Sequence, residues 1–558
     1  MKSGDVAKRL MEMALRLDVL ASRPERARAY RAYAARLKRA GGRAAVRPSA
    51  TPAAGARTVP PWLKRDLDEL IATGSFDALE DARSAVSDEL FALAEAPALG
   101  PRITRVLLER AGARTVSELA DVLRGGFLPR VPSLDAMGKD ALRRLLPEPP
   151  SMLLASARDA GRLVTCALAA EGALAVVSGD TRRGLERVGE LLVLATGIGP
   201  RATADVLRSN DDALLVRSVV VSRDEVYCIL QGRGPLRVRI VPAEDFALAS
   251  LAATSDRGHL RWLERHAVGK GGLAAAARGA DSEQAIYESL GLPYVVPELR
   301  IGACDSGAVV LAERSVRGAF HVHTDWSDGS ASIVAMAEAA RREGYEYIGI
   351  SDHSRAAPYA NGLDEGRLFD QKKGIQRARR DVRGIEILHG IEVDILPDGT
   401  LDLADDVLST LDFVIASVHS DTRMDRRAMT QRLLRAVQNP WVTMLGHPTG
   451  RLLSGKSGYS FDLEAVADAA RENDTWMEIN ANGHRLDLSP ALLRRARARG
   501  ASFAINPDAH SPEGLADVAL GECMARRAGL CADSVKNTRG RREMHKLLDE
   551  RKRLALRH

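Results

Sequence analysis

The sequence predicts a multidomain α/β protein with a helical N-terminal part, a mixed α+β middle region and a C-terminal barrel-like domain. Three observations support this prediction. The chain has 558 residues, too many for a single hydrophobic core. Apolar residues recur at helical spacing through much of the first 150 residues. After residue 316, strand-like and helix-like segments alternate regularly, as in parallel α/β domains. We expect domains at 1–58, 59–150, 151–300 and 316–558.

Composition favours a globular enzyme of the cytoplasm with a polyanionic partner. Hydrophobic residues make up 45% of the chain and charged residues 28%, which is typical of soluble proteins. The N-terminal "MKSGDVAKRLMEMALRL" carries charges among its apolar positions, which argues against a secretory signal. A net charge of +6 favours partners such as nucleic acid. The five cysteines form no CxxC pair, so neither disulfides nor a thiolate zinc site is predicted.

The N-terminal part is predicted to be helical over 5–40, with Pro24 at the start of a helix. A linker rich in Ala, Gly and Pro is predicted to follow at 41–58. Helical patterns resume from Trp62 to Leu146. The break "APALGPRIT" resembles a helix-hairpin-helix, whose glycine turn presents N–H groups to a DNA phosphate. Gly100 and Arg102 are therefore candidate DNA contacts. An ordinary helix turn is the alternative, because Ala98 stands where another glycine is usual; the later break "VPSLDAMGK" fits less well.

The middle region is predicted to mix strands and helices. The segments "ALAVVSG", "ELLVLAT", "EVYCILQ" and "LRVRIVP" have the apolar, β-branched character of strands. Helical stretches separate them, and the region contains no internal repeat.

The C-terminal domain shows seven strand candidates, six of which finish on side chains that bind metals. These strand ends contribute His321, His323, Asp352, His353, Glu392, Asp394, His419, His447, Asp508 and His510, and the remaining candidate ends on Asn480 and Asn482. His321 and His323 are two residues apart, so in a strand both point to the same face. Because a parallel α/β barrel gathers the C-terminal ends of its strands at one mouth, these donors should converge there.

A metal centre explains this recurrence better than core packing does. A lone buried histidine is more often hydrogen-bonded core than ligand, but repetition at the same end of successive elements is hard to explain in that way. The candidate ligands are His321, His323, Asp328, His353, Glu392, His419, His447, Asp508 and His510. Nine donors are too many for one ion, so we expect two or three divalent ions, with Mn or Zn favoured and Fe as an alternative. Glu392 is the expected bridging carboxylate, and such clusters suit phosphate-ester hydrolysis, with amide hydrolysis as the chemical rival.

The motifs of this domain resemble the PHP (polymerase and histidinol phosphatase) superfamily. "HVHTDWSDG", "ISDHS", "GIEVDILPDGTLD", "ASVHS", "LGHPTGRLL", "EINAN" and "DAHSPEG" follow the family's order. The resemblance implies a distorted seven-stranded barrel with three metals and all nine ligands kept. It groups them as His321, His323, Glu392 and Asp508, the expected catalytic set; Glu392, His419 and His447; and Asp328, His353 and His510. Pro507 stands where the family usually has threonine or serine.

The rest of the chain resembles bacterial family X DNA polymerases that carry a C-terminal PHP domain. The segments that carry this resemblance are "ERARAYRAYA", "SGDTRRGLERVGELLVLAT" and "YESLGLPYVVPELR". The resemblance implies a nucleotidyltransferase palm, whose reaction needs three aspartates to hold two Mg²⁺ ions. Here Glu190 and Leu192 replace two of them and Arg237 the third, while Asp180 replaces a serine. We therefore expect no polymerase activity; the alternative is a misalignment that hides other carboxylates, such as Asp205 or Glu225.

The leading hypothesis is a metal-dependent phosphodiesterase of DNA repair that acts on DNA with gaps, nicks or 3′ ends. The resemblance implies a 3′-5′ exonuclease, with abasic-site cleavage or 3′-end cleaning as further activities. Arg182 and Arg183 are candidate DNA contacts, or else part of a solvated face. Residual gap filling, a small-molecule phosphatase and a DNA-end binding scaffold remain alternatives. We expect a monomer. The basic tail "RGRREMHKLLDERKRLALRH" is either a final helix or a flexible arm.

Overall fold

The computed structural model describes residues 3–39, 59–96, 99–111, 119, 151–303 and 309–557. The chain forms two compact units: Met1–Pro150 with Pro200–Arg237, and Ser151–Gly199 with Val238–His558. The four-domain division stays a prediction. None of the described helices combines the length and the apolar character that a membrane crossing requires.

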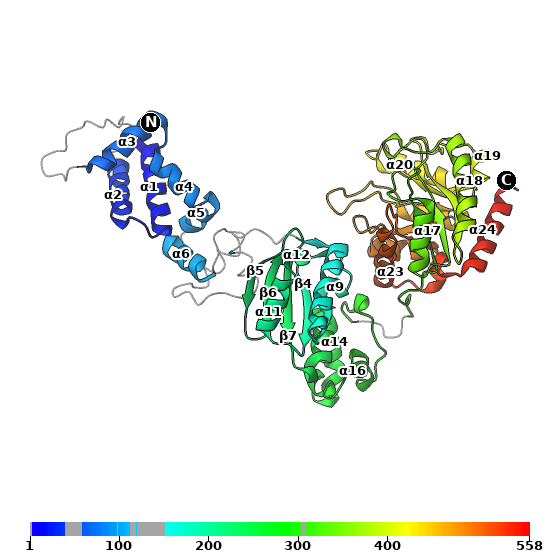
Figure 1. Ribbon diagram of the computed structural model, residues 1–558, viewed down its shortest axis with the longest axis horizontal. Helices are drawn as coiled ribbons and strands as arrows, with labels where there is room; N and C mark the ends of the chain where they lie inside the picture. Colours follow the sequence, from blue (N-terminus) through cyan, green and yellow to red (C-terminus); the bar gives the residue numbers. More distant parts are fainter. Residues whose placement is uncertain are drawn as a thin grey trace. The chain divides into compact units, whose positions relative to one another are not determined.

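The first unit begins with a helical bundle, as predicted (Figure 1). Its helices are α1 (Ser3–Val19), α2 (Pro24–Arg39), α3 (Pro61–Thr73), α4 (Asp77–Ala85), α5 (Asp88–Glu95) and α6 (Gly100–Ala111). Pro24 is the first residue of α2, where its missing N–H costs nothing. Leu10, Tyr30, Leu67 and Phe76 belong to the shared core. The predicted linker at 41–58 and the break at 131–139 lie outside the described residues.

The middle of the chain contributes strands and helices to both units. In the first unit these are α11 (Pro200–Ser209), α12 (Asp211–Leu214), β5 (Val216–Val221) and β6 (Glu225–Leu230). In the second they are β1 (Met152–Leu153), α9 (Leu154–Ala170), β2 (Leu174–Ser178), α10 (Gly179–Arg182), β3 (Arg187–Val188) and β4 (Leu191–Thr196). Strand β7 (Gly234–Ile240) begins in the first unit and ends in the second. The pairs β5–β6, β2–β4 and β1–β3 are all antiparallel.

A small helical subdomain follows within the second unit. It contains α13 (Phe246–Thr254), α14 (Arg257–Ala267), α15 (Leu273–Ala276) and α16 (Glu283–Ser289). Their apolar faces meet around Leu251, Leu263, Ile286 and Tyr287, which are all buried. Val295 and Leu299, in the segment that leads toward the C-terminal domain, belong to the same hydrophobic cluster.

The C-terminal domain is a nearly closed barrel of seven parallel strands, as predicted. The strands are β8 (Gly318–Val322), β9 (Tyr347–Ile350), β10 (Glu386–Asp394), β11 (Phe413–Ser417), β12 (Met444–Leu445), β13 (Trp476–Asn480) and β14 (Phe503–Asn506). They follow one another around the sheet in chain order. A parallel bridge between Val322 and Ala509 brings the ends of the first and last strands together. All strand C-termini therefore lie at one mouth.

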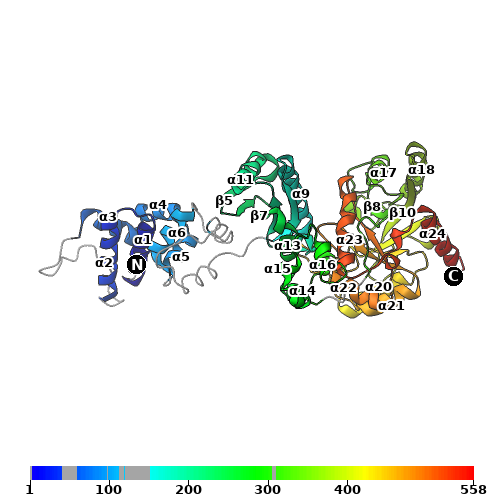
Figure 2. The ribbon, with the colours of Figure 1, turned by 90° about the horizontal axis from the view of Figure 1, so that it is seen from below.

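Helices surround these strands (Figure 2). They are α17 (Ile333–Arg342), α18 (Glu365–Asp381), α19 (Asp405–Leu408), α20 (Arg426–Val437), α21 (Leu463–Glu472), α22 (Pro490–Ala498), α23 (Val518–Arg527) and α24 (Arg541–Ala555). Side chains of Ser332, Asp364, Asp425, Asp462 and Ser489 accept the first free N–H groups of α17, α18, α20, α21 and α22, respectively. These caps explain where the crossover helices begin.

Aromatic side chains fill the barrel interior, and strand glycines make room for them. A Cβ atom at Gly349 would lie 2.6 Å from the ring of Phe413. Phe413 packs in one core with Trp476 and with Met544 and Leu548 of α24. The basic tail therefore contains a helix that buries its apolar side. Of the two predicted alternatives, the final helix is confirmed and the flexible arm is not.

Candidate metal centre

Loops and strand ends at the barrel mouth carry all nine predicted ligands. His321 lies within β8 and Glu392 within β10. The other seven follow the strands β8, β9, β11, β12 and β14: His323, Asp328, His353, His419, His447, Asp508 and His510. The alternation of side chains along each strand directs one face into the barrel, which is why these donors point to a common region.

The nine side chains form four overlapping groups, each with ligand atoms within 4.8 Å of one another. The groups are His323, Asp328, His353 and His510; His321, His323 and Asp508; His321, Glu392 and His447; and His353, Glu392 and His419. The predicted grouping differs in detail, since it placed His323 away from Asp328 and His353 away from Glu392. His321, His323, His353 and Glu392 each belong to two groups, so the four groups form one continuous cluster.

Glu392 lies at the middle of the arrangement. Its Oε1 is 3.0 Å from Nε2 of His447 and 3.4 Å from Nε2 of His419. Its Oε2 is 2.8 Å from Nδ1 of His353. The side chain is buried. A carboxylate with both oxygens among imidazoles is placed to bridge two cations.

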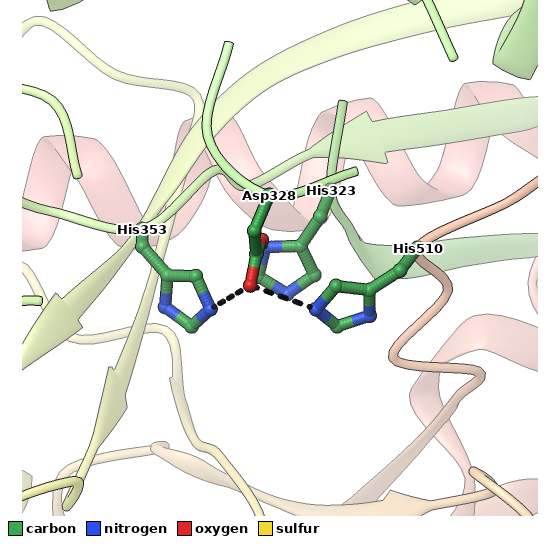
Figure 3. Close-up of side chains that lie close together, drawn as sticks. All are labelled: His323, Asp328, His353 and His510. Atoms are coloured by element: carbon green, nitrogen blue, oxygen red, sulfur yellow. Dashed lines mark ion pairs between the residues drawn. The ribbon is translucent and has the colours of Figure 1, made fainter. Parts of the chain in front are cut away.

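Figure 3 shows the group around Asp328, whose carboxylate lies between the rings of His353 and His510. Asp328 Oδ2 lies 3.5 Å from Nε2 of His353 and 3.4 Å from Nε2 of His510. The side chains of Asp328 and His510 are 33% and 40% exposed, whereas His321, Glu392 and Asp508 are buried. A substrate can therefore reach the centre from the Asp328 side.

Backbone strain coincides with the site. His321, His447 and Asp508 have φ angles of 54°, 23° and 50°, in the left-handed region that residues other than glycine rarely adopt. Such conformations persist when the surrounding structure enforces them, and they concentrate at functional sites.

The polar atoms of the site fit a set of cations. His321 Nε2, both ring nitrogens of His323, His353 Nδ1, His447 Nδ1 and Glu392 Oε2 are buried without a well-aligned hydrogen-bond partner among the described residues. Buried polar groups are otherwise almost always hydrogen-bonded. Imidazoles mixed with carboxylates, without thiolates, are the donor set of catalytic Zn, Mn or Fe sites. The donors present therefore suit the metals that the sequence predicts.

The electrostatics of the site couple imidazoles to carboxylates. Burial opposes the charge of His321, but Glu478, Glu392 and Asp508 raise its pKa well above the ordinary value. Burial also opposes the charges of the acids, yet the histidines hold the pKa of Glu392 and of Asp508 well below the usual range. His323 differs: burial, together with neighbouring His353, lowers its pKa to about 3. The carboxylates are thus ionised and ready to bind cations.

Glu478 is a site residue that sequence reasoning missed. From β13, its Oε1 accepts a hydrogen bond from Nδ1 of His321 at 2.6 Å, and its Oε2 accepts one from the backbone N–H of His447 at 2.6 Å. The first bond leaves Nε2 of His321 for a cation. The alternation of Glu478, Asn480 and Asn482 was the available signal, because it places all three on one strand face.

The predicted DNA contacts lie outside this centre. Gly100 has a φ of 67° at the turn between α5 and α6, and Arg102 is exposed on α6. Ala98 falls outside the described residues. Arg182 makes an ion pair with Glu283, and Arg183 makes one with Asp180. Arg182 at the end of α10 and Arg183 directly after it are therefore paired with carboxylates.

Leu192, Arg237 and the alternative carboxylates Asp205 and Glu225 have the following neighbours in the structure. Leu192 of β4 lies opposite Ser178 of β2, beside the start of α10. Arg237 makes an ion pair with Glu225 at 2.8 Å. Asp205, the other alternative carboxylate, is exposed and pairs with Arg208.

Comparison with known proteins agrees with this geometry. Residues 319–482 match the PHP domain family. The DNA polymerase/3′-5′ exonuclease PolX of Bacillus subtilis (strain 168) is 31% identical over 510 residues, which cover 86% of this chain and 88% of that protein. The chain belongs to the PolX family.

Other relatives of this PolX-family chain share a shorter stretch. A probable phosphatase of Caldanaerobacter subterraneus subsp. tengcongensis is 32% identical over 201 residues, 34% of this chain and 74% of that protein. A probable phosphatase of Thermoanaerobacter sp. (strain X514) is 30% identical over 229 residues, 39% of this chain and 89% of that protein. A PHP domain within a PolX-family chain accounts for both kinds of similarity.

Proposed function

We propose that the chain is a metal-dependent phosphodiesterase that removes nucleotides from 3′ ends of DNA during repair. The observation that carries the proposal is the convergence of nine donors from six strands on four overlapping groups. The printed name of the Bacillus subtilis relative, which joins a DNA polymerase to a 3′-5′ exonuclease, supports DNA as the substrate. DNA with gaps, nicks or 3′ ends is the proposed partner.

In this proposal the nine residues hold two or three divalent ions, Mn or Zn before Fe. His321, His323, Glu392 and Asp508 form the inner, catalytic set, and Glu392 bridges. Divalent ions held by these residues would supply a water nucleophile at neutral pH and would neutralise the charge of the leaving oxygen. The exposed side chains of Asp328 and His510 would face the incoming strand.

We further propose that the palm-like region does not polymerise. An apolar Leu192 and a cationic Arg237 cannot bind Mg²⁺, and Glu225, one of the alternative acids, is paired with Arg237. Among the described residues, the groups of acids and histidines close enough to hold a cation lie in the barrel. DNA would instead be bound by the helical N-terminal part, with Gly100 and Arg102 of α6 as the proposed contacts.

Degradation of a 3′-labelled DNA strand tests the proposal. The full chain should shorten the strand in Mn²⁺, and His321→Ala or Asp508→Ala should reduce the rate at least about a hundredfold, because each removes a ligand of the inner set. His266→Ala changes an exposed histidine far along the chain from the barrel strands and should have no effect. Equal rates in all variants would refute the proposal.

A small-molecule phosphatase is the second candidate, because relatives named as probable phosphatases match a third or more of the chain. Turnover of p-nitrophenyl phosphate, compared with cleavage of an oligonucleotide by the same preparation, separates the two. Faster turnover of the small ester would favour the phosphatase.

A further inference from the structure

The second unit contains a cavity of about 700 Å³ that none of the nine metal-centre residues lines. Its walls come from α9, α10, the turn at Pro297–Leu299, residues 310–313 and α23. The volume lies within the range of small-molecule sites.

One wall of the cavity is cationic. Arg158, Arg162 and Thr165 line it from α9, at positions that share one helical face. Arg158 donates to the backbone carbonyl of Ala519 at 3.2 Å, which leaves its charge uncompensated. Arg162 has no ion-pair partner among the described residues, and its side chain is exposed. Two positive charges on adjacent turns suit an anion.

Two buried donors add to this wall. Arg526 is 5% exposed; its Nε and Nη2 bind Glu298 at 2.8 and 2.7 Å, but its Nη1 is buried without a partner among the described residues. Thr181 is 1% exposed, and its hydroxyl likewise lacks a described partner. Both residues line the cavity. Because leaving such groups unsatisfied costs free energy, they are candidates to bind a ligand's oxygen atoms.

The remaining lining is largely apolar. It includes the ring of Tyr294 with Val177, Val296, Pro297 and Leu311. Glu298 is neutralised by Arg526, and Arg182 by Glu283, so the opposing acid among the lining residues is the exposed Glu313. A ligand with a phosphate at one end and a flat apolar group at the other fits a cavity with one cationic wall and one apolar wall.

We propose that this cavity binds a nucleoside monophosphate. Arg158 and Arg162 contact the phosphate, and Tyr294 lies against the base. The site is separate from the metal centre and does not depend on its chemistry. Occupancy would link α9 and α10 of the palm-like region to α23 of the barrel.

Isothermal titration of the metal-loaded full chain tests this proposal, with dAMP and deoxyadenosine as probes. The double variant Arg158→Ala/Arg162→Ala should weaken dAMP binding at least about tenfold, since it removes two charged donors. Arg342→Ala, an exposed arginine of α17, is the matched control and should leave binding unchanged. Deoxyadenosine should bind at least tenfold more weakly than dAMP.

A Glu392→Gln variant separates this cavity from the metal centre. The Glu392→Gln variant should bind dAMP as the wild type does but degrade the strand more slowly. The Arg158→Ala/Arg162→Ala variant should bind dAMP more weakly but degrade the strand at the wild-type rate. Binding that depends on Glu392 but not on the two arginines would overturn the proposal, as would equal affinity for deoxyadenosine. A 5′-phosphorylated oligonucleotide serves as a third probe: if the double variant weakens its binding but not that of dAMP, a free nucleotide is the wrong ligand.

Discussion

At the scale of single residues, the metal centre depends on carboxylates that orient imidazoles. Glu478 accepts a hydrogen bond from Nδ1 of His321 and so fixes the proton on that nitrogen. Asp394 does the same for His419, with its Oδ1 3.2 Å from Nδ1 of that ring. Each leaves Nε2 directed toward Glu392. These acids bind no substrate, but they determine which nitrogen meets a cation.

Replacement of Glu478 by glutamine should weaken metal binding about 10- to 100-fold, because the amide cannot fix the His321 tautomer as a carboxylate does. Titration of Mn²⁺ into the full chain, followed by calorimetry, measures the affinity directly. Glu338→Gln, an exposed change on α17, is the control. Unchanged affinity in the Glu478 variant would mean that its hydrogen bonds serve only the fold.

The nine ligands could be predicted because seven of them follow a strand-like segment and the other two, His321 and Glu392, lie near the C-terminal end of one. Glu478 was missed, although its alternation with Asn480 and Asn482 marks one strand face, because it lies inside "TWMEIN" and looks like part of a strand core. Its role comes from contacts with His321 and His447, which are 157 and 31 residues away in the sequence. The left-handed backbone conformation of His321 and Asp508 could not be predicted from the sequence either, because no local pattern marks a positive φ at a histidine or an aspartate.

At the scale of elements, a buried ion network joins α10 to α16. Glu283 accepts from Arg182 Nη2 at 3.1 Å, from Arg300 Nη2 at 2.6 Å and from the Ser250 hydroxyl at 2.5 Å. Burial opposes ionisation of Glu283, but the two arginines lower its pKa from 4.5 to about 2. The sequence suggested Arg182 as a DNA contact. Its pairing with Glu283 could not be predicted, because the two residues are 101 positions apart and no local pattern marks the pair.

Glu283→Gln should lower the free energy of unfolding by about 3 kcal/mol at pH 7, which is what the pKa change corresponds to. Because the folded-state pKa is depressed, this contribution is complete above pH 4.5 and is lost as the pH falls toward 2. Urea unfolding at pH 7 and pH 3 measures the difference. Glu288→Gln, exposed on the same helix, should change stability by less than about 0.5 kcal/mol. A Glu283 variant as stable as the wild type at pH 7 would contradict this account.

At the scale of the whole molecule, the chain combines a PHP domain, which forms a barrel of seven parallel strands, with a helical N-terminal part and a middle region of mixed strands and helices. The alternation of strands and helices after residue 316 was enough to predict the barrel, and the strand order confirms it. The two compact units were not predicted, because they divide the middle of the chain at 199 and 237 rather than at a linker. Such a boundary depends on three-dimensional packing, which composition does not reveal.

Primer extension on gapped DNA should fail for this protein. The assay is best made in the His321→Ala background, so that degradation cannot hide synthesis. Leu192 and Arg237 provide no ligand for Mg²⁺, so no added nucleotide should be detected when dNTPs are present. The Bacillus subtilis relative on the same DNA is the positive control. Robust extension would show that other carboxylates complete the site.

The bound-metal content of the purified full chain, determined together with its degradation of a 3′-labelled strand, tests the central claim most directly. The account predicts two or three divalent ions per chain and a Glu392→Gln variant that loses metal and activity together, because Glu392 belongs to two of the four groups. A metal-free wild type that still degrades the strand, or a Glu392 variant that keeps both metal and activity, would contradict it.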